Sequence, residues 1–129
     1  MKNGNIEILD LDFEYKLWKN KTTCMLTEVD LFIDRIHILK REHLNLKIDN
    51  FILELLNLQH KALKQINNTI RTHEQEIAFY AEDYPILTGH SHYVIHENIR
   101  VEMEKVMNRH QNIISEILPK LCYPMDTTQ

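Results

Sequence analysis

Apolar residues recur at steps of three and four along most of the chain, which is the spacing of helices that bury one face. Three such segments predict helices near 12–43, 48–82 and 90–118. The first carries the series Trp18, Thr22, Met25, Val29, Phe32, Ile36, Leu39, His43 and Leu46. The second carries Ile48, Ile52, Leu55, Gln59, Ala62, Ile66, Thr69, His73, Ile77 and Tyr80. The third carries His92, His96, Ile99, Met103, Val106, His110, Ile113 and Ile117.

The breaks between these segments have residues that start or stop helices. Asp10 or Asp12 can cap the first helix. The pattern loses phase around 45–50, and a short turn is expected at about 44–48. The second helix is expected to end at Tyr84-Pro85, because a residue that precedes proline avoids the helical region. Pro119 is expected to stop or kink the third helix. No sheet is expected.

Composition indicates a single helical domain. The chain has 129 residues, of which 43% are hydrophobic and only two are glycine, and hairpins and phosphate-binding loops need more glycine than that. The expected fold is all-α: an elongated, antiparallel, up-down-up three-helix bundle with coiled-coil-like packing over 1–129 and flexible ends at about 1–9 and 120–129. The short turns place Trp18, His73 and Ile99 at one level of this bundle.

Charge and hydropathy exclude some partners. With 15 basic and 19 acidic residues the net charge is −4, whereas nucleic-acid-binding proteins usually present a basic face. No apolar stretch approaches the ~20 residues that span a bilayer. Asp10 and Asp12 fall where a signal peptide would be apolar, and Cys24 and Cys122 fit no metal spacing. We therefore expect a cytoplasmic protein with reduced thiols that binds neither nucleic acid nor membrane.

Histidines at inward positions are the main chemical candidates. His92 and His96 lie one turn apart on one helix face, a spacing that lets two imidazoles share a metal ion. The predicted register brings His73 to within about one turn of them, with Glu76, Glu14 and Asp12 at similar height and His90 at the turn. One hypothesis is a divalent metal site formed by His73, His92 and His96. The alternative is that these imidazoles only fill partly buried positions and are satisfied by water and neighbouring side chains.

No catalytic site is expected. A reactive cysteine needs a nearby base, but no histidine is predicted to face Cys24, and Cys122 follows the third helix. The aromatic residues at helical spacing are expected to belong to the core rather than to a ligand site: Trp18, Phe32, Phe51, Phe79 and Tyr80. No organic cofactor is therefore expected.

A second apolar line on the first helix predicts self-association. Leu17, Cys24, Leu31 and Ile38 follow one another at intervals of seven residues, so they share a face that points away from the buried series. Such a stripe suits a partner helix and favours a homodimer. The alternative is that these are ordinary exposed aliphatic residues.

Several landmarks resemble those of a group of small bacterial helical proteins to which no activity is assigned. They are Trp18, the run Glu28-Val29-Asp30-Leu31-Phe32 with Arg35-Ile36, the pair His73-Glu74, and His90-Ser91-His92. The resemblance spans most of residues 14–118 and implies a helical fold without implying a function. The leading hypothesis is therefore a bundle that acts by protein–protein contact, and the alternative is a metal-binding bundle.

Overall fold

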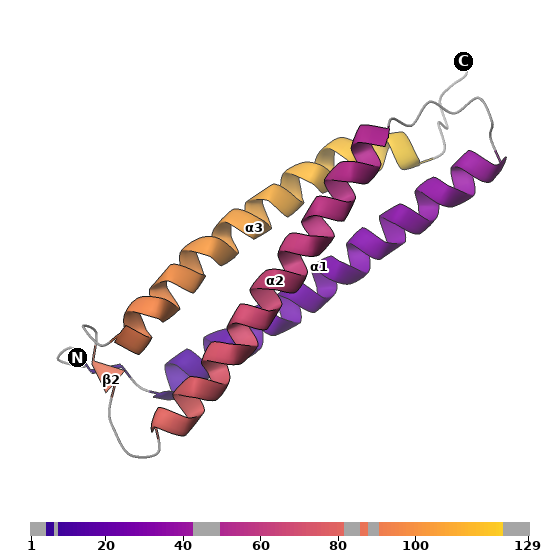
Figure 1. Cartoon of the computed structure of the whole chain (residues 1–129). Coiled ribbons are helices and arrows are strands. Elements are labelled where there is room, and N and C mark those ends of the chain that lie inside the picture. The colour runs from indigo at the N-terminus through magenta and orange to yellow at the C-terminus, as the bar shows by residue number, and fades with distance from the viewer. Residues whose placement is uncertain (1–4, 7, 43–49, 82–85, 88–90, 123–129) are drawn as a thin grey trace.

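Three long helices form an elongated bundle in the computed structural model of the chain (Figure 1). They are α1 (Ile8–Glu42), α2 (Asn50–Ala81) and α3 (Ser91–Leu121), and all three pack against one another. The structure describes residues 5–6, 8–42, 50–81, 86–87 and 91–122. The predicted all-α three-helix architecture is confirmed, with each helix boundary within four residues of the expected position.

A small β-ladder accompanies the helices, so the expectation of no sheet is wrong. Asn5–Ile6 (β1) pairs with Ile86–Leu87 (β2) in antiparallel register, Asn5 opposite Leu87 and Ile6 opposite Ile86. Both segments lie outside the helices, where backbone N–H and C=O groups need other partners. The ladder connects the segment before α1 to the segment between α2 and α3.

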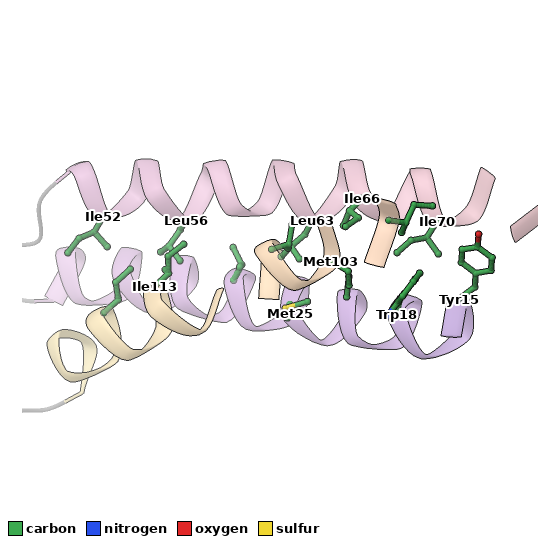
Figure 2. Close-up of a cluster of buried hydrophobic side chains, with 14 of the residues drawn as sticks. Tyr15, Trp18, Met25, Ile52, Leu56, Leu63, Ile66, Ile70, Met103 and Ile113 are labelled. Carbon is green, nitrogen blue, oxygen red and sulfur yellow. The ribbon is translucent and has the colours of Figure 1, made fainter. Parts of the chain in front are cut away.

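The core follows a seven-residue repeat in every helix (Figure 2). Side chains of α2 such as Leu56, Leu63 and Ile70 point toward α1 and α3 and are fully buried. On α3 the buried residues are those the sequence predicted, from His96 to Ile117. Burial of one such aliphatic side chain contributes ~1.5–3 kcal/mol, so the repeat is the main source of favourable burial in the bundle.

The phase of the buried series on α2 differs from the prediction at alternate positions. Leu56, Leu63 and Ile70 are buried, whereas the predicted Leu55 and Ala62 are only half-buried and Thr69 is exposed. Steps of three and four are compatible with either phase. The observed phase places the larger aliphatic side chains in the core and therefore removes more apolar surface from water.

The aromatic residues divide between core and surface. Trp18 is buried and Phe32 packs partly against the core, as expected. The prediction was wrong for Phe51 and Phe79, which are 62% and 85% exposed. Tyr15 is completely buried, although the predicted series began only at Trp18. The side chain of Tyr80 lies outside the described residues, as do His43, Leu46 and Ile48.

Both outer helix ends extend further than predicted. α1 begins at Ile8, and α3 continues through Pro119 to Leu121, so residues 8–9 and 120–121 are helical rather than loose ends. Proline disfavours a helix interior, because it lacks an N–H and its ring crowds the preceding turn. Two features stabilise the last turn of α3. The Leu121 side chain is buried, and Arg35 Nε donates a hydrogen bond to the Leu121 carbonyl at 3.0 Å.

The relative heights of the helices agree with the expected register. Lys19 Nζ lies 2.6 Å from Glu74 Oε1, next to the predicted level of Trp18 and His73. Further along the bundle, His110 contacts Glu28 and Gln59, which shows that α1 and α2 are at matching heights there as well. Because the helix heights are as expected, the candidate residues can be compared directly with their predicted neighbours.

Candidate functional site

The α1 stripe, defined as Leu17, Cys24, Leu31 and Ile38, lies mainly on the surface. Leu17 is 38% and Leu31 is 61% exposed, Cys24 is exposed, and Ile38 is half-buried. Each residue follows a core position by two residues, a rotation of about 200° around the helix. The structure thus brings the four residues onto one outer face of α1, as the seven-residue spacing predicted.

A hollow of about 340 Å³ between α1 and α3 adjoins this stripe. It is lined by Leu31, Phe32, Arg35, Leu118, Leu121 and Cys122. Leu118 is 45% exposed, so the apolar surface continues from α1 across to the last turns of α3. Sequence reasoning missed this extension because it ended the third helix at Pro119. Cys122, like Cys24, is an exposed free thiol.

The three predicted metal ligands have different environments. His96 is completely buried, and its Nε2 lies 2.6 Å from Glu14 Oε1. His73, on α2, has its Nδ1 3.0 Å from Glu76 Oε1 without hydrogen-bond geometry, and His92 is half-buried. Within the described ranges, no three His, Cys, Asp or Glu side chains are grouped so that they could hold a metal ion.

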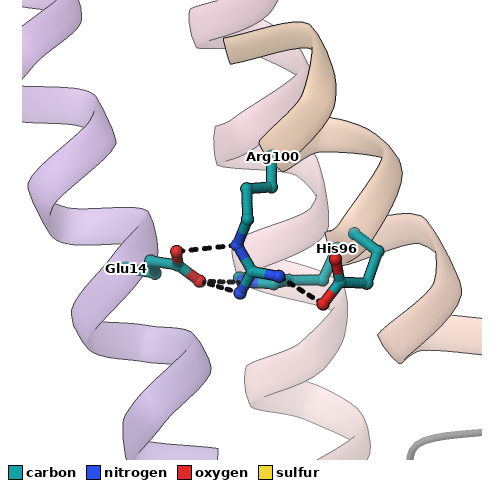
Figure 3. A network of polar contacts seen from close by, with 4 residues as sticks. Glu14, His96 and Arg100 are labelled. Carbon is teal, nitrogen blue, oxygen red and sulfur yellow. Dashed lines mark hydrogen bonds and ion pairs between the residues drawn. The ribbon is translucent and has the colours of Figure 1, made fainter. Parts of the chain in front are cut away.

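A polar network at the α1–α3 interface surrounds His96 (Figure 3). Glu14 receives two hydrogen bonds from Arg100, from Nη2 to Oε1 at 2.6 Å and from Nε to Oε2 at 2.9 Å. Arg100 also donates to Glu97 on its own helix. A carboxylate held in two places by a guanidinium is a strong, directional pair. Sequence reasoning placed Glu14 at this height but did not identify Arg100 as its partner.

Burial and hydrogen bonding shift the pKa values in this network. Burial raises the pKa of Glu14, but the hydrogen bonds from Arg100 and His96 outweigh it and leave that pKa below its ordinary value. Loss of water lowers the pKa of His96, and the opposing hydrogen bond to Glu14 only partly compensates. The network therefore favours an ionised Glu14 beside a neutral His96 that donates through Nε2.

Two aromatic rings enclose the His96 imidazole. Trp18 stacks on it with ring centroids 4.9 Å apart, and Tyr15 meets it edge-on at 4.6 Å. Neither His96 Nδ1 nor the Tyr15 hydroxyl, both buried, has a hydrogen-bond partner among the described residues. Burial, together with nearby carboxylates, also raises the pKa of Tyr15. Enclosure of this kind holds the ring in place and shields its second nitrogen.

A second pair, Glu28 and His110, repeats this arrangement 14 residues further along both helices. His110 Nε2 lies 2.7 Å from Glu28 Oε1, and its Nδ1 lies 3.5 Å from Gln59 Nε2. Gln59 also donates to the Val106 carbonyl at 3.2 Å. An Nε2–H tautomer of His110 satisfies both contacts, because Nδ1 then accepts from the amide. The buried His110 and Gln59, together with the exposed Glu28, thus connect all three helices through polar contacts.

Comparisons with models of protein families, with curated proteins and with solved structures found no match. The resemblance to small bacterial helical proteins therefore remains a prediction. Among the described residues, no helix is both long enough and apolar enough to cross a membrane.

Proposed function

We propose that this chain acts by protein–protein contact and that it self-associates as a homodimer through the α1 stripe. The observation that carries the proposal is the exposure of Leu31, at 61%, beside the apolar hollow between α1 and α3. Contiguous apolar surface of this kind usually marks a contact site. The net charge of −4 favours a protein partner over nucleic acid.

The proposal includes a cytoplasmic setting and no catalytic role. Two free, exposed thiols suit a reducing compartment, in which they do not oxidise to disulfides. The buried polar groups suit a structural role, because His96 has one nitrogen engaged by Glu14 and the other enclosed in the core. A buried polar pair of this kind can specify helix register and orientation.

The test is to place charges on the α1 stripe. Leu17→Lys together with Leu31→Lys should weaken the contact, because each lysine would have to lose its hydration in the interface. Val94→Lys together with Val101→Lys is the matched control, since Val94 and Val101 are 47% and 48% exposed on the outer side of α3. Sedimentation equilibrium measures the mass of each protein, and circular dichroism checks that each is folded.

The proposal predicts that the α1-stripe variant forms a smaller assembly than the unmodified protein, whereas the control variant forms an assembly of the same mass. Equal masses for the unmodified protein and the α1-stripe variant would contradict it. Ile38 is left unchanged in this design because it is half-buried, so that a lysine there would also disturb the core.

A further inference from the structure

An open groove runs between α2 and α3, on the other side of α3 from the α1 stripe. It encloses about 460 Å³. Its floor includes the core residues Ile66, Ile99 and Val106, and its rims include Gln65, Glu102 and Arg109. The groove is apolar at the base and polar at the edges, as helix-binding grooves are.

The groove is open because the α2 residues at this helix boundary cover little of the core, although Ile95 of α3 packs against it. The α2 residues that line it include Ala62 and Thr69, whose side chains are small. At the α1–α2 boundary, by contrast, Leu26, Ile33 and Leu53 pack over the core. A bundle closed on one side and open on the other leaves room for a further helix.

A line of exposed residues on α2 borders the groove. Its members, called the α2 stripe, recur at intervals of seven: Phe51, Leu58, Gln65, Thr72 and Phe79. Phe51 is 62%, Leu58 is 64% and Phe79 is 85% exposed. Gln65 belongs to both the stripe and the groove, so the two features form one surface. Large apolar side chains are costly to leave in water and gain most from a partner.

The charges on α3 indicate what the partner is. Glu102 and Arg109 line the same groove seven residues apart, have opposite charges and are both exposed. In an antiparallel pair of α3 helices related by a two-fold axis midway between them, each Glu102 would face the other copy's Arg109. Arg109 makes no ion pair with any described residue, and Glu102 has only a 3.4 Å contact with Lys105. The groove is therefore complementary in charge to itself.

We propose that a second copy of this chain occupies the α2–α3 groove, with the two α3 helices antiparallel and two reciprocal Glu102–Arg109 pairs at its rim. The apolar floor and the α2 stripe supply the buried area, and the charges set the register. This contact is separate from the one through the α1 stripe. A protein that uses both contacts forms an assembly larger than a dimer.

Charge reversal followed by charge exchange tests the proposal. Glu102→Arg alone would place two arginines opposite each other, and Arg109→Glu alone would place two glutamates opposite each other. Each variant replaces two attractive pairs by two repulsive ones, so it should raise the dissociation constant of this contact about 10-fold or more. The double variant Glu102→Arg/Arg109→Glu restores opposite charges and should restore the affinity.

Sedimentation equilibrium of the full chain gives the readout. Glu104→Arg is the matched control, because Glu104 is exposed on the same helix but turned about 200° from Glu102. Masses that fall in both single variants and recover in the double variant support the groove contact. A mass unchanged in Glu102→Arg, or a double variant as weak as the single ones, overturns it.

The two contacts can be separated in the background of Leu17→Lys/Leu31→Lys. If this background remains a dimer that Glu102→Arg converts to a monomer, the groove contact is supported. If the unmodified protein associates and the background is already a monomer, the groove contact is refuted and the α1-stripe proposal stands. If only the groove variants change the mass, the α1-stripe proposal fails and the groove contact stands.

Discussion

The carboxylate of Glu14 and the imidazole of His96 lie 2.6 Å apart across the interface of two parallel helices, α1 and α3. The Glu28–His110 pair has the same geometry at 2.7 Å, and each pair is separated by 82 residues in the sequence. A slide of α3 by one turn would break both pairs at once and leave two buried imidazoles without an acceptor. The two pairs therefore select one register for helices that a purely apolar repeat would allow to slide.

The first prediction concerns the effect of pH on stability. The pKa of His96 is below its ordinary value of 6.5 in the folded protein, so the unfolded chain binds more protons as the pH falls. The contribution of His96 is therefore fully present above pH 6.5 and is lost as the pH falls through the folded-state pKa. The lowered pKa of Glu14 acts in the same direction below its ordinary value of 4.5.

Urea unfolding at about pH 7.5 and about pH 5.5 measures this dependence. The His96→Gln variant should be less stable at both pH values, but its free energy of unfolding should fall less between them, since the titrating ring is gone. The other histidines are present in both proteins, so their contributions to the pH dependence of stability cancel in the comparison. An equal fall in the two proteins would show that His96 does not contribute.

The second prediction tests the phase of α2. Leu63 is completely buried and Leu58 is 64% exposed, so the same substitution should have different effects at the two positions. Leu63→Ala should lower the free energy of unfolding by about 2–5 kcal/mol, because it removes buried surface and leaves a cavity. Leu58→Ala should change it by less than about 1 kcal/mol. Chemical denaturation measures the free energy of unfolding of both variants. Similar losses would mean that the buried face of α2 is not the one that contains Leu63.

Periodicity predicted the architecture because it records which face of each helix is apolar. On α3 the buried positions from His96 to Ile117 were predicted correctly, because the predicted series followed the face that packs against the other helices. On α2 apolar residues cover more than one face, and Leu55 and Leu56 compete for the same core position. Packing against α1 and α3 selects between them, and a single helix carries no information about that packing.

The polar contacts were harder to predict for a related reason. Histidine at an inward position shows that a polar group is buried, but not which nitrogen is bound or by which residue. Glu14 and Arg100 lie 86 residues apart in the sequence, and their contact depends on the rotation of both helices. The end of α3 was missed because the contact of Arg35 with the Leu121 carbonyl is equally long-range.

The third prediction measures the contribution of the Glu14 carboxylate. Glu14→Ala removes the acceptor of the buried His96 Nε2 and of two Arg100 hydrogen bonds. We expect a loss of about 1–3 kcal/mol, the usual cost of leaving a buried donor unsatisfied. Glu97→Ala is the control, because its 39% exposed side chain contacts Arg100 and Tyr93 rather than the His96 imidazole. Its effect should be below about 1 kcal/mol, since exposed ion pairs contribute little.

Thermal unfolding of Glu14→Ala and Glu97→Ala, side by side, gives the comparison. A His96→Phe substitution in each background serves as a further check, because it removes the imidazole that Glu14 accepts from. The loss caused by Glu14→Ala should shrink in this background, as expected for residues that interact. Losses that simply add would show that the two side chains act independently.

The fourth prediction concerns added zinc and tests the hypothesis that His73, His92 and His96 bind a metal ion. For His96 to become a ligand, its Nε2 would have to leave Glu14, or its enclosed Nδ1 would have to become accessible between Trp18 and Tyr15. Either change costs a buried hydrogen bond or core packing. We therefore expect micromolar zinc to leave the melting temperature essentially unchanged, because only binding to the folded state raises it.

Melting curves with zinc, and with a chelator as the reference, test this expectation, and elemental analysis of the purified protein gives independent evidence. His92→Ala and His96→Ala are the informative variants, because a shared metal ion would need both imidazoles. A marked rise in melting temperature with zinc that both variants abolish would favour the metal site over the structural role of His96. A rise that survives both substitutions would indicate binding elsewhere on the surface.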